Sequence, residues 1–114
     1  MMQPGAQAEQ LAVQYLQQQG LTLIMQNYRS RFGEIDLIMK DGTALVFVEV
    51  RLRRNADFGG AAASIDTRKQ QRIIHTAQHY LANFARIPPC RFDVVLMGGE
   101  KGEEMEWLKN AFDA

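Results

Sequence analysis

Cysteine, long apolar runs and net charge are all scarce in this chain, and each shortage excludes a class of protein. A single cysteine, Cys90, permits no internal disulfide and no metal or redox centre built on cysteine. The longest apolar runs are strand-sized, such as 45–48, and Met1–Gln10 has neither a basic start nor an apolar stretch. We therefore expect a cytoplasmic protein that neither spans nor targets a membrane.

The length and the composition set the number of domains. The chain has 114 residues, of which 46% are hydrophobic and 23% are charged, the balance of an ordinary globular domain. It is too short for two cores of normal size. We expect a single domain over residues 1–114.

The net charge of zero conceals an uneven distribution. Residues 1–99 carry eleven Lys and Arg against eight Asp and Glu, whereas residues 100–114 carry two against five. Six basic residues lie within a segment of 22, namely Arg51, Arg53, Arg54, Arg68, Lys69 and Arg72. Such a group can contact nucleic-acid phosphates or can be an ordinary solvated surface, and charge alone leaves both interpretations open.

Apolar residues at helical spacing predict two helices. The first covers Gly5–Gln19, and Gly20 follows as its C-cap. The second begins at Thr67, which forms a capping box with Gln70, and Pro88-Pro89 prevents its continuation. Its core-facing stripe consists of Ile73, Ile74, Ala77, Tyr80, Leu81 and Phe84.

Alternating apolar residues predict strands at 33–39, 44–52 and 91–97, with a short extended piece at 21–25 and a last alternating segment around Met105 and Trp107. The first two strands flank Lys40–Thr43, whose Asp-Gly pair is typical of an antiparallel hairpin. Both faces of this hairpin are largely apolar, so both must be covered. The sequence predicts an α/β fold with a central sheet flanked by helices.

Two carboxylates are placed on one face of the hairpin. A turn centred on Asp41-Gly42 sets Asp36 across from Phe47, and strand alternation then places Asp36, Glu49 and Arg51 on the same side, opposite to Ile35. Acids on adjacent strands lie within about 5–8 Å between backbones. Together they can hold one Mg²⁺ or Mn²⁺ ion beside a substrate phosphate.

A structural interpretation of these acids is equally compatible with their spacing. Asp36 and Glu49 can form salt bridges with Arg51, Arg53 or Arg29 at one end of the sheet. Their position beside apolar residues favours function slightly, because a charge there costs desolvation free energy unless an ion or partner compensates it.

The chain resembles the YraN family of bacterial proteins in three motifs that follow in order, Gly33–Ile38, Val46–Arg51 and Arg91–Val95. Glu9, the Phe58-Gly59 pair and Lys69 also fit, so the resemblance covers nearly the whole chain. That family looks related to the restriction-endonuclease-like, or PD-(D/E)XK, superfamily. The resemblance implies a mixed sheet between helices and a nuclease-like site.

The resemblance implies a role for each acid. Asp36 matches the first acid of the superfamily signature, Glu49 matches the second, and Glu9 matches an acid that some members supply from the first helix. Arg51 stands where the pattern has lysine. Arginine can stabilise negative charge, but it stays protonated at physiological pH and cannot act as a base.

Other charged residues carry weaker signals. Arg68, Lys69 and Arg72 occupy the first turns of the second helix, where the dipole disfavours cations unless a bound phosphate or Asp66 compensates. His75 and His79 lie four apart on this helix without an evident third metal ligand, so we expect a solvated pair. Asp93 is expected to be a structural partner of an arginine.

Three functions remain open. The first is a metal-dependent nuclease acting on structured DNA, with Mg²⁺ or Mn²⁺ on Asp36 and Glu49 and with Arg51 stabilising the transition state. The second is a nucleic-acid-binding module whose catalysis is weakened or lost, and the third is a protein-interaction adaptor on the same fold. A homodimer is compatible with DNA binding, because so small a domain covers little DNA alone.

Overall fold

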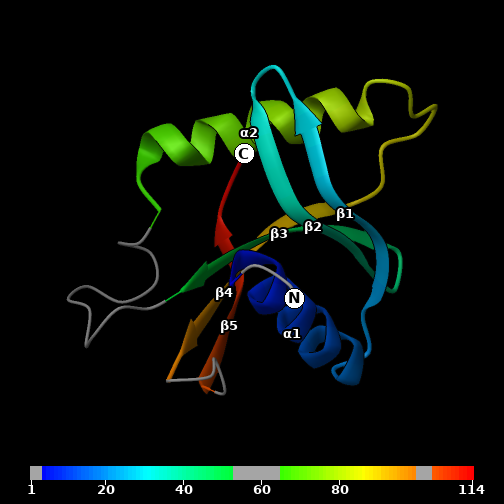
Figure 1. Cartoon of the computed structure of the whole chain (residues 1–114). Helices are drawn as coiled ribbons and strands as arrows, with labels where there is room; N and C mark the ends of the chain where they lie inside the picture. Colours follow the sequence, from blue (N-terminus) through cyan, green and yellow to red (C-terminus); the bar gives the residue numbers. More distant parts are fainter. Residues whose placement is uncertain (1–3, 53–64, 100–103) are drawn as a thin grey trace.

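The computed structural model describes residues 4–52, 65–99 and 104–114, and these form an α/β structure with one five-stranded mixed sheet (Figure 1). The strands are β1 (Thr22–Ser30), β2 (Gly33–Asp41), β3 (Ala44–Leu52), β4 (Cys90–Gly98) and β5 (Glu104–Phe112). The helices are α1 (Pro4–Gln18) and α2 (Thr67–Leu81). The predicted α/β class, with a central sheet flanked by helices, is confirmed.

The strands lie in the sheet in chain order, β1-β2-β3-β4-β5. Neighbours pair antiparallel except β3 and β4, which are parallel and are joined by the segment that contains α2. A parallel pair needs a long crossover connection, and a helix on one face of the sheet supplies it. The parallel strands β3 and β4 are therefore interior strands of the sheet, and β1 and β5 are its edges.

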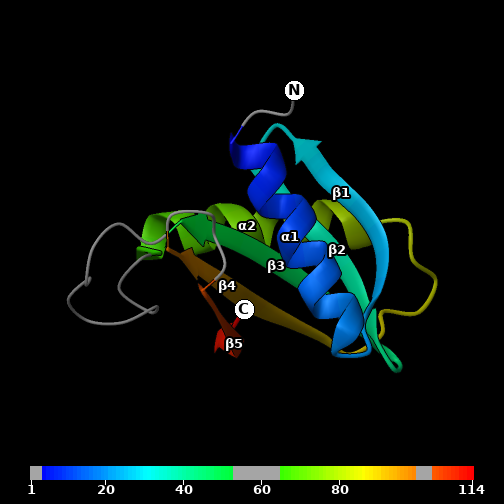
Figure 2. The ribbon, with the colours of Figure 1, turned by 60° about the horizontal axis from the view of Figure 1, so that its bottom comes forward.

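The two helices cover opposite faces of the sheet (Figure 2). Under α1, Ala12 and Leu16 pack in a cluster with Leu37, Val46 and Val95. Under α2, a second cluster consists of Ile35, Ile38, Leu45, Phe47, Ile73, Ile74, Ala77 and Phe92. The two apolar faces predicted for the hairpin are therefore both buried, one under each helix.

The helix boundaries follow from caps. Gly20 has a φ of +99°, and the Leu21 N–H donates to the Leu16 carbonyl at 3.0 Å, which closes the end of α1. At the start of α2 the cap is Asp66, because its side chain accepts from the Lys69 N–H at 2.8 Å. The expectation that Thr67 caps this helix is wrong by one residue.

Three further sequence expectations are corrected. The piece at 21–25 is the start of a nine-residue strand, β1, which pairs with β2. Phe47 lies across from Ile38, so the hairpin register is two residues away from the predicted pairing of Phe47 with Asp36. Helix α2 ends at Leu81, and Phe84 beyond it is 38% exposed instead of buried on the helix stripe.

Side-chain alternation breaks down in the middle of β2. Ile35 and Ile38 share the cluster under α2, whereas Leu37 and Met39 belong to the cluster under α1. Strand alternation predicts that Ile35 and Leu37 share a face, and the structure shows that this is wrong. Strict alternation would separate Ile35 from Ile38, so the strand changes orientation around Asp36.

No helix of the described residues has the length and apolar character needed to cross a bilayer.

Candidate functional site

The site begins where β2 and β3 separate. Their pairing runs from the turn as far as Leu37 and Val48, and one residue beyond it the Asp36 Oδ2 accepts a hydrogen bond from the Val50 N–H at 2.9 Å. A carboxylate thus takes the place of a strand carbonyl as the partner of this N–H. The Asp36 carboxylate therefore lies between the two strands at this point.

Glu49 lies beside this gap on β3 and is 5% exposed. Its Oε1 lies 2.9 Å from the Lys69 Nζ, and the Lys69 side chain, 37% exposed, reaches it from the first turn of α2. The crossover connection brings the helix back over the strand that precedes it, which places the two residues together. The buried carboxylate is therefore paired with one ammonium group that still contacts solvent.

The charges at the site are incompletely balanced. Burial, followed by the negative charge of Asp36, raises the pKa of Glu49 to about 7, while Lys69 and Arg51 oppose the shift. Burial also raises the pKa of Asp36 above its usual value, and the hydrogen bonds from Val50 and with Glu49 oppose this. Two interacting carboxyl groups share too little positive charge for both to ionise easily.

Glu9 approaches the same region from α1. Burial and then the charge of Asp36 raise its pKa, whereas a hydrogen bond with the Asn27 side chain lowers it. Asn27 belongs to β1 and has a φ of +56°, a left-handed conformation that asparagine tolerates better than most residues. The structure thus brings Glu9 within electrostatic range of Asp36.

These residues suit a hard divalent cation with few protein ligands. No group of three or more His, Cys, Asp or Glu side chains with a metal-binding arrangement occurs among residues 4–52, 65–99 and 104–114. Asp36 and Glu49 supply oxygen ligands only, and Mg²⁺ is commonly held by one or two carboxylates together with water and phosphate. The raised pKa values indicate that added positive charge would be stabilising here.

The predicted basic residues divide into three groups. Lys69 is in the site, and Arg51 lies close enough to Glu49 to lower its pKa. Arg68 and Arg72 are exposed on α2. Arg53 and Arg54 lie outside the described residues, as does the Phe58-Gly59 pair.

The pairing of Lys69 with Glu49 was not predicted, because it depends on the path of a long crossover. The only local signal is a lysine in the first turn of a helix that follows the acidic strand.

Two other candidates, Asp93 and the pair of His75 and His79, have contacts of their own with residues outside the acidic site. Asp93 is 1% exposed and accepts hydrogen bonds from the Arg91 Nε, the Trp107 Nε1 and the Asn110 N–H. The expectation that Asp93 is the partner of an arginine is confirmed. His75 and His79 are exposed, and His79 Nδ1 lies 2.6 Å from the Tyr28 hydroxyl.

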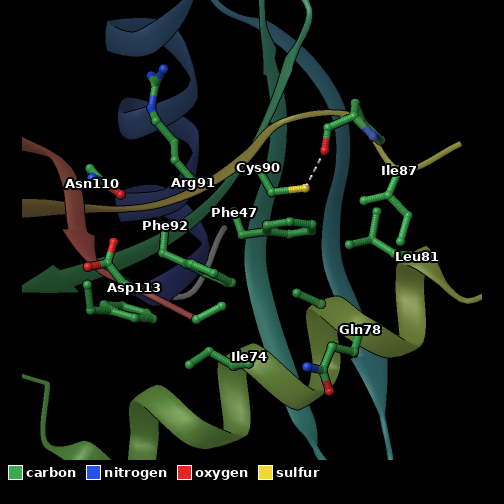
Figure 3. A pocket seen from close by; sticks show the side chains of 14 residues that line it. Phe47, Ile74, Gln78, Leu81, Ile87, Cys90, Arg91, Phe92, Asn110 and Asp113 are labelled. Atoms are coloured by element: carbon green, nitrogen blue, oxygen red, sulfur yellow. Dashed lines mark hydrogen bonds between the residues drawn. The ribbon is translucent and has the colours of Figure 1, made fainter.

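An apolar pocket of about 240 Å³ lies apart from the acidic site, between the C-terminal half of α2 and the start of β4 (Figure 3). Phe47, Ile74, Leu81 and Phe92 line it, together with Cys90, whose Sγ donates to the Pro88 carbonyl at 3.2 Å. The Arg91 side chain points away from the phenyl rings. None of the acids of the candidate site borders this pocket.

The fold and site define an α/β protein with an acidic centre where two neighbouring strands of its sheet separate. The chain belongs to the UPF0102 family, described as an uncharacterised protein family, whose model matches residues 8–97. This is the YraN family that the sequence resembles. The expected family is therefore confirmed.

Relatives match over almost their full lengths. The chain is similar to a UPF0102 protein of Nitrosomonas europaea, with 59% identity over 96% of this chain and 92% of that protein. It is 53% identical to a UPF0102 protein of Methylobacillus flagellatus over the whole of both chains. A UPF0102 protein of Legionella pneumophila is 55% identical over 96% of this chain and 94% of its own length.

Proposed function

We propose that this protein is a metal-dependent nuclease that acts on structured DNA and has a restriction-endonuclease-like fold. The observation that carries the proposal is the Asp36–Glu49 pair, two interacting carboxyl groups held at the point where β2 and β3 separate. Buried acids with raised pKa values are uncommon outside functional sites, because their charged forms are costly unless they bind a cation.

Asp36 and Glu49 are the residues that would hold Mg²⁺ or Mn²⁺. The ion, when bound, would supply Lewis-acid stabilisation of a phosphate and a lowered pKa for a bound water. Lys69 lies 2.9 Å from Glu49 and so places a compact cation next to the same centre. In this proposal Lys69, reaching in from α2, supplies the ammonium group that the strand position of Arg51 lacks.

The remaining roles follow from charge. In hydrolysis, the oxygen of water bonds to phosphorus as the bond from phosphorus to the leaving ester oxygen breaks, the water releases a proton to solvent, and the leaving oxygen takes a proton from solvent to become a hydroxyl. Arg51 stays protonated and would stabilise the additional negative charge on the phosphate. Glu9 would help to position the ion from α1. Arg68 and Arg72 are exposed on the same helix as Lys69 and would contact the phosphates of the nucleic-acid strand.

The test is a cleavage assay over duplex, nicked, branched and single-stranded DNA and over RNA, with Mg²⁺ or Mn²⁺. Asp36→Asn, Glu49→Gln and Lys69→Met should each lower the rate about 100-fold or more, since each removes charge from the reacting centre. Lys40→Met is the matched control, because Lys40 is exposed near the turn at the other end of β2. It should cleave at the wild-type rate.

Arg51→Lys tests which position, that of Lys69 or that of Arg51, is the one where an ammonium group matters for cleavage. If Lys69 supplies the ammonium group, this substitution should not increase the cleavage rate, whereas a gain would show that the strand position is the one that matters. Cleavage that survives Glu49→Gln would place the site elsewhere. Binding without cleavage on every substrate would favour the nucleic-acid-binding module, and the lack of both would favour the protein-interaction adaptor.

A further inference from the structure

The β1–β2 hairpin carries an exposed aromatic ring at its tip, beside α2. Phe32 is 37% exposed, and the Arg31 guanidinium lies over its ring at 4.9 Å from the centroid. The rings of His75 and His79 approach it at centroid distances of 5.6 and 6.5 Å in edge-on arrangements. Two imidazole rings thus pack against Phe32 at steep angles, and one face of the ring lies under a planar cation.

The tip is fixed against α2 by contacts that do not involve the Phe32 ring. The Ser30 hydroxyl donates to the Thr76 hydroxyl at 3.4 Å and accepts from the Phe32 N–H at 3.1 Å. A Cβ placed on Gly33 would lie 3.6 Å from the Arg72 Cβ, so the two backbones are close. The hairpin is therefore anchored, and the exposure of Phe32 is not needed to hold it.

Positive charge surrounds the ring. Arg31 and Arg72 are both exposed at the tip, and Arg68 follows one turn away along α2. Aromatic rings among arginines are the usual means of binding unpaired nucleotides, because bases stack on the rings and on guanidinium planes while phosphates pair with the charges. A duplex keeps its bases stacked inside and cannot use such a ring.

The ring lies at a useful distance from the acidic site. His75, which contacts Phe32, is six residues beyond Lys69 on α2, or about 9 Å along the helix axis. A stacked strand advances about 3.4 Å per nucleotide, so this distance corresponds to roughly two or three nucleotides. This axial separation is the shortest path that one strand would follow between the two places.

We infer that Phe32 and Arg31, with Arg72 beside them, form a subsite for an unpaired nucleotide two or three positions from the bond at the Asp36–Glu49 centre. This inference rests on the proposed function and specifies its substrate: nucleic acid with a single-stranded segment next to the reacting position. The base stacks on Phe32 or on the guanidinium above it, and Arg72 pairs with the adjoining phosphate.

The test measures binding by the full chain without divalent ions, so that it does not depend on cleavage. The probes are a fluorescent oligothymidylate, the corresponding oligouridylate and a blunt duplex of equal length. Phe32→Leu, which keeps an apolar side chain but removes the ring, should weaken binding to the single strands about tenfold and leave duplex binding within about twofold. Phe32→Tyr should retain wild-type affinity.

Phe84→Leu is the matched control, because Phe84 is 38% exposed and follows the C-terminal end of α2, outside the group of Arg31, Phe32 and Arg72. It should bind both probes like the wild type, and all variants should keep the wild-type thermal midpoint within a few degrees. The inference is overturned if the wild type does not bind single strands. It is also overturned if Phe32→Leu weakens duplex and single-strand binding equally, or if it weakens neither. Ring-dependent binding without any cleavage would retain this subsite and reject the nuclease.

Discussion

At the scale of single residues, Glu49 is the most informative side chain. It is 5% exposed, it contacts the Lys69 ammonium, and burial together with Asp36 raises its pKa to about 7. Its ordinary pKa is 4.5, so between these two values the folded protein holds a proton that the unfolded chain has released. The unfolded chain is therefore favoured as pH rises through this window.

The first residue-scale prediction is a dependence of stability on pH. The thermal midpoint of the wild type should fall between about pH 4.5 and pH 7, and Glu49→Gln should reduce that fall because the amide has no proton to lose. Thermal unfolding monitored by circular dichroism across this range measures it. A Glu104→Gln variant, which changes an exposed acid on β5, is the control and should follow the wild type.

The same charge imbalance predicts the effect of a cation. Mg²⁺ added at about pH 8 should raise the midpoint of the wild type, because a ligand that binds only the folded state stabilises it. The increase should be lost in Glu49→Gln. An equal increase in both proteins would mean that the ion binds elsewhere, and no increase in either would weigh against the proposed metal site.

The sequence could indicate part of this arrangement. Alternation along two strands is enough to associate Asp36 with Glu49, since a register error of two residues preserves the face of every side chain. The same rule cannot anticipate the change of orientation around Asp36, which moves Ile35 to the cluster under α2. It also cannot place Lys69 against Glu49, because that contact depends on tertiary structure.

At the scale of elements, the start of α2 positions Lys69. Asp66 accepts from the Lys69 N–H at 2.8 Å, and the Gln70 side chain donates to the Ile65 carbonyl at 3.1 Å. Asp66 also places a negative charge beside Arg68 and Lys69, at the helix end where cations are otherwise unfavourable. The cap therefore fixes the turn from which the site lysine extends.

Asp66→Ala should lower stability by about 1 kcal/mol, the usual effect of losing an N-cap acceptor. For a domain of this size the thermal midpoint should fall by about 4 °C. Thr67→Ala is the control and should cost much less, because Thr67 is the first helical residue and not the cap. Equal losses from both variants would show that the helix begins at a different residue.

Most elements were predictable because their apolar patterns are regular. The β1 strand was recognised only in part, since its register shifts between Leu23 and Met25 and Asn27 adopts a positive φ. All nine of its residues are at least partly exposed, so few buried apolar residues mark its course. The order of the strands could not be read from these patterns, because it depends on contacts between distant segments.

At the scale of the whole molecule, charge has an arrangement that the net value of zero conceals. Arg68 and Arg72 extend along α2 from the acidic site toward Arg31 at the hairpin tip. The binding that we propose would therefore be mainly electrostatic, with release of counterions from the nucleic acid. A neutral protein can bind in this way when its basic residues gather on one surface.

The double variant Arg68→Ala/Arg72→Ala should flatten the dependence of affinity on salt. Each lost phosphate contact should reduce the slope of log affinity against log salt by about 0.9 for duplex DNA. The matched control is Lys40→Ala/Arg86→Ala, which removes the same charge from exposed positions. Fluorescence anisotropy over a salt series measures both, and identical slopes for the two double variants would place the binding surface elsewhere.

The two outer strands of the sheet share a feature. Among the described residues, only Asn27 in β1 and Asn110 in β5 combine a side chain with a positive φ, and each outer strand also shifts register against its neighbour. Both outer edges therefore lack the long, straight row of unpaired backbone groups on which another chain could add a strand. A consequence that such interrupted edges predict is a lower tendency to add a strand from a second molecule.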